Sequence, residues 1–127
     1  MSPPTHMFTV LVVDDEAAMR ALTRRMLEGE GYQVYEAADG VEALATLAQG
    51  WPVDVIVTDI RMLCMDGRER ASRLTMHSPR MPIVFMSGYD VYLGPIELPG
   101  PVLAKPFRSE ELTVLVSQLL ARQAQNV

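Results

Sequence analysis

Short apolar runs alternate along the chain with stretches in which apolar residues recur at helical spacing. Five of these runs are rich in β-branched or other apolar residues and predict strands. They cover residues 8–13, 33–38, 53–58, 83–87 and 101–104. Strands that alternate with helices predict an α/β fold, a parallel sheet with helices on both faces. Five strands in 127 residues fit the flavodoxin-like doubly wound order, 2-1-3-4-5.

The intervening segments predict the helices. Residues 16–30 carry apolar side chains on one face, and a second helix starts at the Asp39-Gly40 turn and ends at Gly50. A weakly patterned helix is expected over residues 68–77. Ser109 is the predicted cap of the last helix, whose apolar face carries Leu112, Leu115, Val116, Leu119 and Leu120.

The segment GPIELPGP, residues 94–101, stands where this fold needs its fourth helix. Its three prolines remove backbone donors, and its two glycines favour other conformations. We therefore predict at most one helical turn over residues 88–100, so that the fourth helix is shortened or missing. The domain is expected to span residues 8–122, with flexible ends at 1–7 and 123–127.

Polar residues stand where four of the predicted strands end. Asp14 and Asp15 follow the first strand, Asp59 the third, Ser87 the fourth and Lys105 the fifth. Ligand sites in doubly wound sheets lie outside the carboxyl ends of the strands, so these residues should converge. Each has an ordinary structural explanation on its own, such as a helix cap for one of the first two acids or a turn. Five such residues at one edge favour a binding site.

The predicted set of three carboxylates, a hydroxyl and an ammonium suits chemistry on a phosphoryl group. Three close carboxylates ionise together only when a cation relieves their repulsion. Mg²⁺ takes one or two carboxylates together with waters and phosphate oxygens, and the lysine and hydroxyl can hold the other phosphoryl oxygens. A carboxylate can also be the nucleophile and form an acyl phosphate. Asp59 is the best candidate because its predicted position is central.

Composition and charge narrow the function further. Hydrophobic residues make up 49% of the chain, which excludes a disordered protein. The net charge of −5 argues against direct binding to nucleic acid or anionic membranes. No apolar stretch is long enough to span a bilayer, and residues 1–8 lack the features of a signal peptide. The one cysteine, Cys64, excludes an internal disulfide and fits the cytoplasm. We interpret it as a passive thiol, because nothing marks His6 or His77 as its base.

Several motifs occur together in one order: VVDDE at 12–16, Asp59 followed by Met62 and Asp66-Gly67, MSG at 86–88, and AKPF at 104–107. Over residues 8–122 the chain resembles the receiver domain of response regulators in two-component signalling. VFMSGY and AKPF are particularly similar to receivers attached to hybrid sensor histidine kinases. The resemblance implies that Asp59 accepts a phosphoryl group from a histidine kinase or a histidine phosphotransfer domain.

The resemblance also implies roles for the other site residues. Asp15 and Asp59 would bind Mg²⁺ directly, Asp14 would bind it through water, and the carbonyl of Arg61 would be a further ligand. Ser87 and Lys105 would contact the phosphoryl oxygens and couple phosphorylation to loop movement. Such a domain signals by conformational change and catalyses only its own phosphorylation and dephosphorylation.

The chain also departs from the family pattern. Leu63 stands where a proline is usual, and Val102 stands where a switching Tyr or Phe is usual. Because the usual dimer face includes the fourth helix, we expect a monomer or a weak dimer, with the kinase docking near the first helix. We further predict a cis Lys105–Pro106 bond, which would turn the ammonium into the site.

Two other classes share part of this chemistry. A haloacid-dehalogenase-like phosphatase also uses an aspartyl phosphate, but it needs a DxDx[TV] pattern after the first strand, and VVDDEAAM lacks it. A flavodoxin needs a loop rich in hydroxyls and glycines there, where this chain has acids. A receiver would turn over small phosphodonors slowly and need no flavin.

Overall fold

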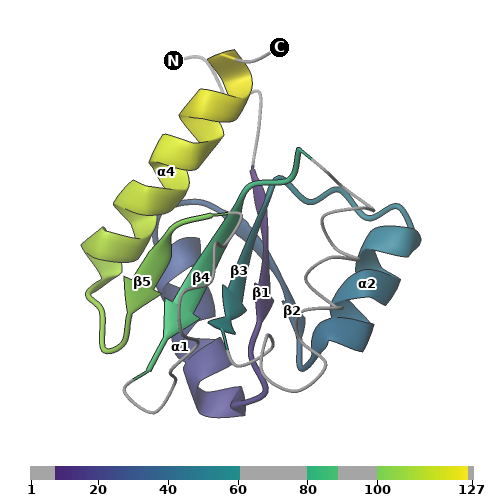
Figure 1. The fold of residues 1–127 in the computed structure, drawn as a ribbon, viewed down its shortest axis with the longest axis horizontal. Helices are drawn as coiled ribbons and strands as arrows, with labels where there is room; N and C mark the ends of the chain where they lie inside the picture. The colour runs from purple at the N-terminus through teal and green to yellow at the C-terminus, as the bar shows by residue number, and fades with distance from the viewer. Residues whose placement is uncertain (1–7, 61–79, 89–99, 126–127) are drawn as a thin grey trace.

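Five parallel strands form one sheet in the order β2-β1-β3-β4-β5, which confirms the predicted topology (Figure 1). The computed structural model describes residues 8–60, 80–88 and 100–125. The strands are β1 (Thr9–Val13), β2 (Gln33–Ala37), β3 (Val55–Asp59), β4 (Ile83–Ser87) and β5 (Val102–Ala104).

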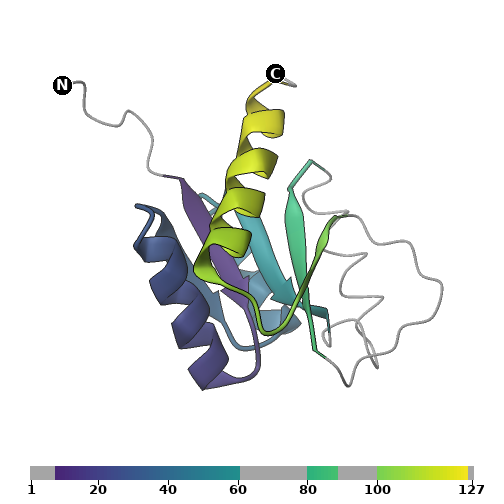
Figure 2. The same cartoon turned by 90° about the vertical axis from the view of Figure 1, so that its left-hand side faces the viewer.

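Helices pack on both faces of the sheet, as expected for a doubly wound fold (Figures 1 and 2). The described helices are α1 (Ala17–Glu28), α2 (Gly40–Ala48) and α4 (Ser109–Gln125). Helices α1 and α4 share one face with each other, and α2 packs on the opposite face. The helix predicted over 68–77 and most of the loop predicted over 88–100 lie outside the described residues. None of the helices in the described ranges is both long and apolar enough to cross a membrane.

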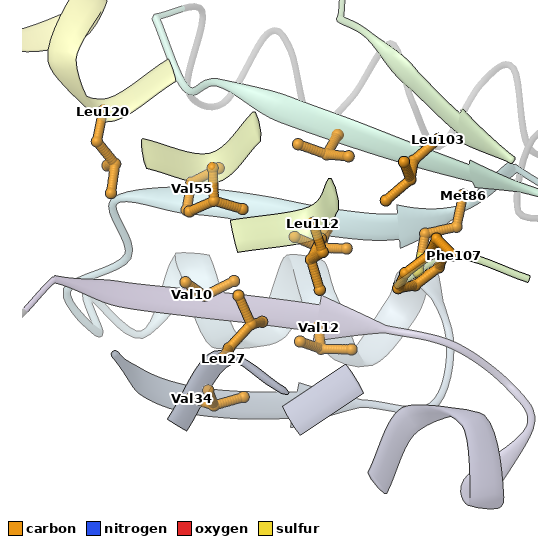
Figure 3. Close-up of a cluster of buried hydrophobic side chains, with 13 residues drawn as sticks. Val10, Val12, Leu27, Val34, Val55, Met86, Leu103, Phe107, Leu112 and Leu120 are labelled. Carbon is orange, nitrogen blue, oxygen red and sulfur yellow. The ribbon is translucent and has the colours of Figure 1, made fainter. Parts of the chain in front are cut away.

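The core consists of two apolar layers, one on each face of the sheet. Alternate residues of β1 show the division: Val10 and Val12 join the layer under α1 and α4, whereas Leu11 and Val13 join the layer under α2. Figure 3 shows the first layer, which includes Leu27, Val34, Val55, Met86, Leu103, Phe107, Leu112 and Leu120. Strands that are buried on both faces read as continuous apolar runs, and this explains why the sequence pattern located them.

The helix boundaries agree with the sequence pattern to within a few residues. Helix α2 starts at the predicted Asp39-Gly40 turn, and Asp39 is its N-cap, because its side chain accepts the Glu42 N–H. The prediction that Ser109 caps the last helix is wrong, since α4 already includes it, and the Arg108 N–H donates to Glu111 Oε1 at 2.9 Å. Helix α4 also continues to Gln125, beyond the expected end of the domain at residue 122.

Close backbone packing fixes the entrance to β5. A Cβ atom on Gly100 would lie 1.9 Å from the carbonyl oxygen of Ile83, so only glycine fits there. The next residue, Pro101, accepts a hydrogen bond from the Phe85 N–H at 2.9 Å. Gly100 therefore allows β5 to approach β4 closely.

The outer side of β2 carries an aromatic pair and an ionic network. Tyr35 meets the half-exposed Trp51 edge to face, with ring centroids 5.3 Å apart. On the α1 side, Glu36 accepts hydrogen bonds from Arg20 Nε at 3.0 Å and from Arg24 Nη1 at 2.6 Å. The hydrogen bond from Arg24, aided by Arg20, lowers the pKa of Glu36 below its ordinary value despite partial burial.

The Glu36 network predicts a pH-dependent contribution to stability. We expect Glu36→Gln to lower the free energy of unfolding at pH 7 by about 0.5–1 kcal/mol, the upper part of the range for ion pairs screened by solvent, because Glu36 has two arginine partners. Because the folded pKa of Glu36 is depressed, this contribution is complete above the ordinary value of 4.5 and is lost as the pH falls through the folded pKa. Denaturant unfolding of both proteins between neutral and acid pH measures the difference.

A suitable control is Glu28→Gln, because Glu28 makes a single exposed pair with Arg24. Its effect should be smaller than that of Glu36→Gln. A difference between wild type and Glu36→Gln that stays the same at acid pH would contradict the assignment of this stability to the ionised carboxylate.

Candidate functional site

The sheet register brings the ends of the strands to one edge of the molecule (Figure 1). Val13 is level with Thr58, and Asp59 is level with Met86 on the neighbouring strand. Ser87 is in turn level with Ala104, the residue before Lys105. The structure therefore places Asp14, Asp15, Asp59, Ser87 and Lys105 at the same edge, as predicted from their order in the chain.

Asp14 is fully buried and turns the chain from β1 toward α1. Its N–H donates to the carbonyl of Ala37 at 3.1 Å, and its Oδ1 accepts the Glu16 N–H at 2.9 Å. The N-cap of α1 is Glu16, which makes no side-chain cap hydrogen bond, so neither Asp14 nor Asp15 stands at the N-cap position that the structural alternative required. Burial raises the pKa of Asp14, and the hydrogen bonds it accepts do not fully offset this effect.

Lys105 joins the two buried aspartates. Its Nζ lies 2.8 Å from Asp59 Oδ2 and 3.4 Å from Asp14 Oδ2, and the two carboxylates are 1% and 0% exposed. Burial acts to lower the pKa of Lys105, but the hydrogen bond to Asp59 and the charges of both acids raise it above its ordinary value. The ammonium is thus charged at neutral pH and partly neutralises the acids. The Lys105–Pro106 bond is cis, as predicted.

Ser87 lies beside this lysine at the end of β4. Its carbonyl accepts the Lys105 N–H at 2.7 Å, and its hydroxyl donates to the carbonyl of Gly88 at 3.4 Å. The side chain is half-buried at the edge where the carboxylates gather. A hydroxyl and an ammonium thus stand at the ends of two neighbouring strands, next to the acidic residues.

The donor set fits a hard divalent cation. Asp14, Asp15 and Asp59 each offer a carboxylate oxygen, and the three oxygens lie within 4.8 Å of one another. Mg²⁺ binds oxygen at about 2.1 Å, so opposite ligands in its octahedron are about 4.2 Å apart. Small side-chain movements would therefore bring the acids to ligand distance, and the exposed position of Asp15 leaves room for waters or phosphate oxygens. The fourth predicted ligand, the carbonyl of Arg61, lies outside the described residues.

Sequence reasoning missed one contact of the acidic site. Arg20 Nη1 donates to the main-chain carbonyl of Asp14 at 2.8 Å, and Glu36 holds the same guanidinium through Nε. The available signal was weak: Arg20 is the first cation after the paired acids, and it lies on the helix that follows them.

Comparison with known proteins agrees with this geometry. The family model of the response regulator receiver domain matches residues 10–117. Sensor kinase CckA of Brucella abortus (strain 2308) is 38% identical over 120 residues, which cover 91% of this chain and 13% of that protein. Response regulator MprA of Mycobacterium sp. (strain KMS) is 38% identical over 117 residues, or 89% of this chain and 50% of that protein. The chain thus spans half or less of the length of these two relatives.

Solved structures show the same fold. A response regulator receiver protein from Sinorhizobium medicae WSM419 is 34% identical, with a TM-score of 0.77, and the alignment covers 93% of this chain and 98% of that one. The receiver domain of the hybrid histidine kinase CckA is 32% identical, with a TM-score of 0.73 and coverage of 88% and 98%. In these two comparisons the similarity extends over nearly the whole of each solved chain.

Proposed function

The chain belongs to the response regulator receiver domain family, and from that membership we propose that Asp59 accepts a phosphoryl group in a Mg²⁺-dependent reaction. One observation supports this assignment above the others. Asp59 is buried at the end of β3, where its carboxylate contacts the Lys105 ammonium and lies close to two further acids. A nucleophile for phosphoryl transfer needs this combination of positioning and nearby positive charge.

The proposed reaction is an in-line displacement at phosphorus. A carboxylate oxygen of Asp59 attacks, the P–N bond of a phosphohistidine breaks, and its electron pair stays on the imidazole nitrogen. The imidazole leaves neutral when its second nitrogen carries a proton, and Asp59 becomes an acyl phosphate. Lys105 and Ser87 hold phosphoryl oxygens and offset the charge that builds up on them. Water later attacks the acyl phosphate and regenerates the carboxylate, so the domain acts on its own phosphoryl group only.

Asp14, Asp15 and Asp59 would hold the metal ion, together with the carbonyl of Arg61. A bound Mg²⁺ supplies positive charge to the phosphoryl oxygens in such sites. Asp59 and Asp15 are proposed as direct ligands, and Asp14 as a ligand through water.

The proposed partner is a sensor histidine kinase or a histidine phosphotransfer domain. The relatives named as a sensor kinase and as response regulators favour this class of partner. We propose docking near α1 and the loop after Asp59, where a histidine can reach the carboxylate. We further propose that the domain is a monomer or a weak dimer and makes no direct contact with nucleic acid.

Incubation of the protein with acetyl phosphate and Mg²⁺ tests the proposed reaction directly. Intact-mass measurement should show the gain of one phosphoryl group, which EDTA prevents and which decays slowly after the donor is removed. No gain under these conditions, or an equal gain in EDTA, would contradict the proposal.

Replacement of Asp15 separates a metal-binding role from a structural one. We expect Asp15→Ala to abolish Mg²⁺ binding, followed by calorimetry, and to prevent the gain of the phosphoryl group. In the metal-free protein it removes one of three neighbouring negative charges, so the melting temperature should be equal to or higher than that of wild type.

Asp39→Ala is the matched control, because Asp39 is an aspartate that does cap a helix. This variant should lose about 1 kcal/mol of stability and keep its Mg²⁺ affinity. A large loss of stability in Asp15→Ala, comparable to that of the control, would instead assign Asp15 a structural role.

A further inference from the structure

A line of alternating charges leads from the C-terminal end of α1 to the acidic site. Arg24 bonds Glu28 Oε2 at 3.1 Å and Glu36 Oε2 at 2.6 Å, and Glu36 Oε1 accepts from Arg20 Nε at 3.0 Å. Arg20 then reaches the carbonyl of Asp14 with Nη1 at 2.8 Å. Exposure falls along this line, from 46% and 42% for Glu28 and Arg24 to 28% and 20% for Glu36 and Arg20. Glu36 and Arg20, which lie nearest the acidic site, are therefore the more restrained side chains of this line.

The carbonyl that Arg20 binds belongs to the peptide unit between Asp14 and Asp15. A peptide unit is planar, so a hydrogen bond to its oxygen restrains the rotation of the whole plane. That rotation sets the direction in which the chain enters Asp15, whereas the carboxylate of Asp14 is held separately by Glu16 and Lys105. Arg20 thus acts on the relative orientation of the two consecutive acids.

We infer that Arg20 is a positioning residue for the metal site: it fixes the Asp14–Asp15 peptide, and Glu36 on the edge strand β2 orients its guanidinium. The inference rests on the proposed function, because Mg²⁺ is the ligand that the two acids are positioned to bind. A guanidinium suits this task, since its rigid fork can bond Glu36 and the carbonyl at the same time.

If Arg20 acts only through its charge, its removal should strengthen Mg²⁺ binding, and if it positions the ligands, its removal should weaken Mg²⁺ binding. A cation near a cation-binding site repels the incoming ion, so the loss of its charge alone should strengthen Mg²⁺ binding. Loss of a group that orients the ligands should weaken binding, as is usual for outer partners of metal ligands. The sign of the change therefore distinguishes the two effects.

Arg24 provides the matched control. It pairs with the same carboxylate of Glu36 and lies one helical turn further along α1. Within the described residues its guanidinium bonds Glu28 and Glu36, whereas the Asp14 carbonyl is bonded by Arg20. Both arginines take part in the ionic network, so a purely structural role would predict similar effects of replacing either one.

The test is a calorimetric Mg²⁺ titration of the wild type, Arg20→Gln, Arg20→Lys and Arg24→Gln. We expect Arg20→Gln to raise the dissociation constant about tenfold, and Arg24→Gln to change it by less than about twofold, because a distant exposed charge is screened. Arg20→Lys keeps the charge but lacks the fork, so it should resemble Arg20→Gln. In the metal-free proteins, amide exchange at residues 15–17 should be faster in both Arg20 variants and unchanged in Arg24→Gln.

Unchanged or tighter Mg²⁺ binding by Arg20→Gln would overturn the inference and leave the proposed function intact, provided that wild type still gains a phosphoryl group. Equal weakening in Arg20→Gln and Arg24→Gln would also overturn it, because the effect would then be a general one of the network. A wild-type protein that binds no Mg²⁺ would overturn the inference and the proposed metal dependence together.

Discussion

Asp59→Asn should abolish the gain of a phosphoryl group from acetyl phosphate. The amide is a far weaker nucleophile than the carboxylate and cannot form the acyl phosphate. The substitution also removes the negative charge that Lys105 contacts at 2.8 Å, without changing the size of a side chain that is 1% exposed. The variant should therefore stay folded, and intact-mass measurement should show no phosphoryl adduct at times when wild type is modified.

Asp54→Asn is the matched control, because Asp54 directly precedes β3 and lies at its opposite end. Its Oδ2 accepts the Thr9 N–H at 2.7 Å, a structural contact away from the acidic edge. This variant should gain the phosphoryl group as wild type does. An adduct of normal yield on Asp59→Asn would refute Asp59 as the acceptor.

Lys105→Met should have the largest effect on stability. In the metal-free protein it leaves Asp14 and Asp59 buried without their shared cation. Breaking a buried ion pair in this way costs about 3 kcal/mol, the lower end of the usual range. Added Mg²⁺ should restore more stability to the variant than to wild type, since it supplies the missing charge. Loss of a group that holds phosphoryl oxygens should also slow phosphorylation about a hundredfold.

Denaturant unfolding with and without Mg²⁺ measures the effect on stability. Arg108→Met serves as the control, because the Arg108 side chain is 81% exposed and its pair with Glu111 is long, at 3.4 Å. We expect no measurable change in unfolding for this variant. Unfolding of Lys105→Met that matches wild type in EDTA would show that the two aspartates do not depend on the lysine.

The sequence predicted the sheet and most of the site for a common physical reason. Strands buried on both faces give short, nearly continuous apolar runs, such as residues 9–13. A parallel sheet then gathers the carboxyl ends of its strands at one edge, so residues as distant as Asp14 and Lys105 could be placed together. The match to the receiver domain family favours a receiver site at that edge over the site of a phosphatase or a flavodoxin.

Contacts between elements were harder to predict. Arg20 and Glu36 lie on different elements, and no local pattern pairs a helix arginine with one particular strand glutamate. The choice between a cap and a site residue for Asp14 also needed the structure, in which its side chain bonds the Glu16 N–H, which precedes the helix, instead of an N–H within the first turn. Helix α4 continues to Gln125, past the expected domain end at residue 122, because a polar sequence is compatible with a frayed end as well as with a helix.

The edge-to-face pair of Tyr35 and Trp51 provides an intrinsic fluorescence signal for the folded state. Trp51 is the only tryptophan of the chain, and it precedes β3, at the end of the sheet opposite the acidic edge. Its fluorescence therefore responds mainly to whether β2 and the end of α2 stay together, and little to the state of the aspartates. Unfolding separates the two rings and ends short-range energy transfer from tyrosine to tryptophan. The intrinsic emission thus follows the loss of the fold without any attached label.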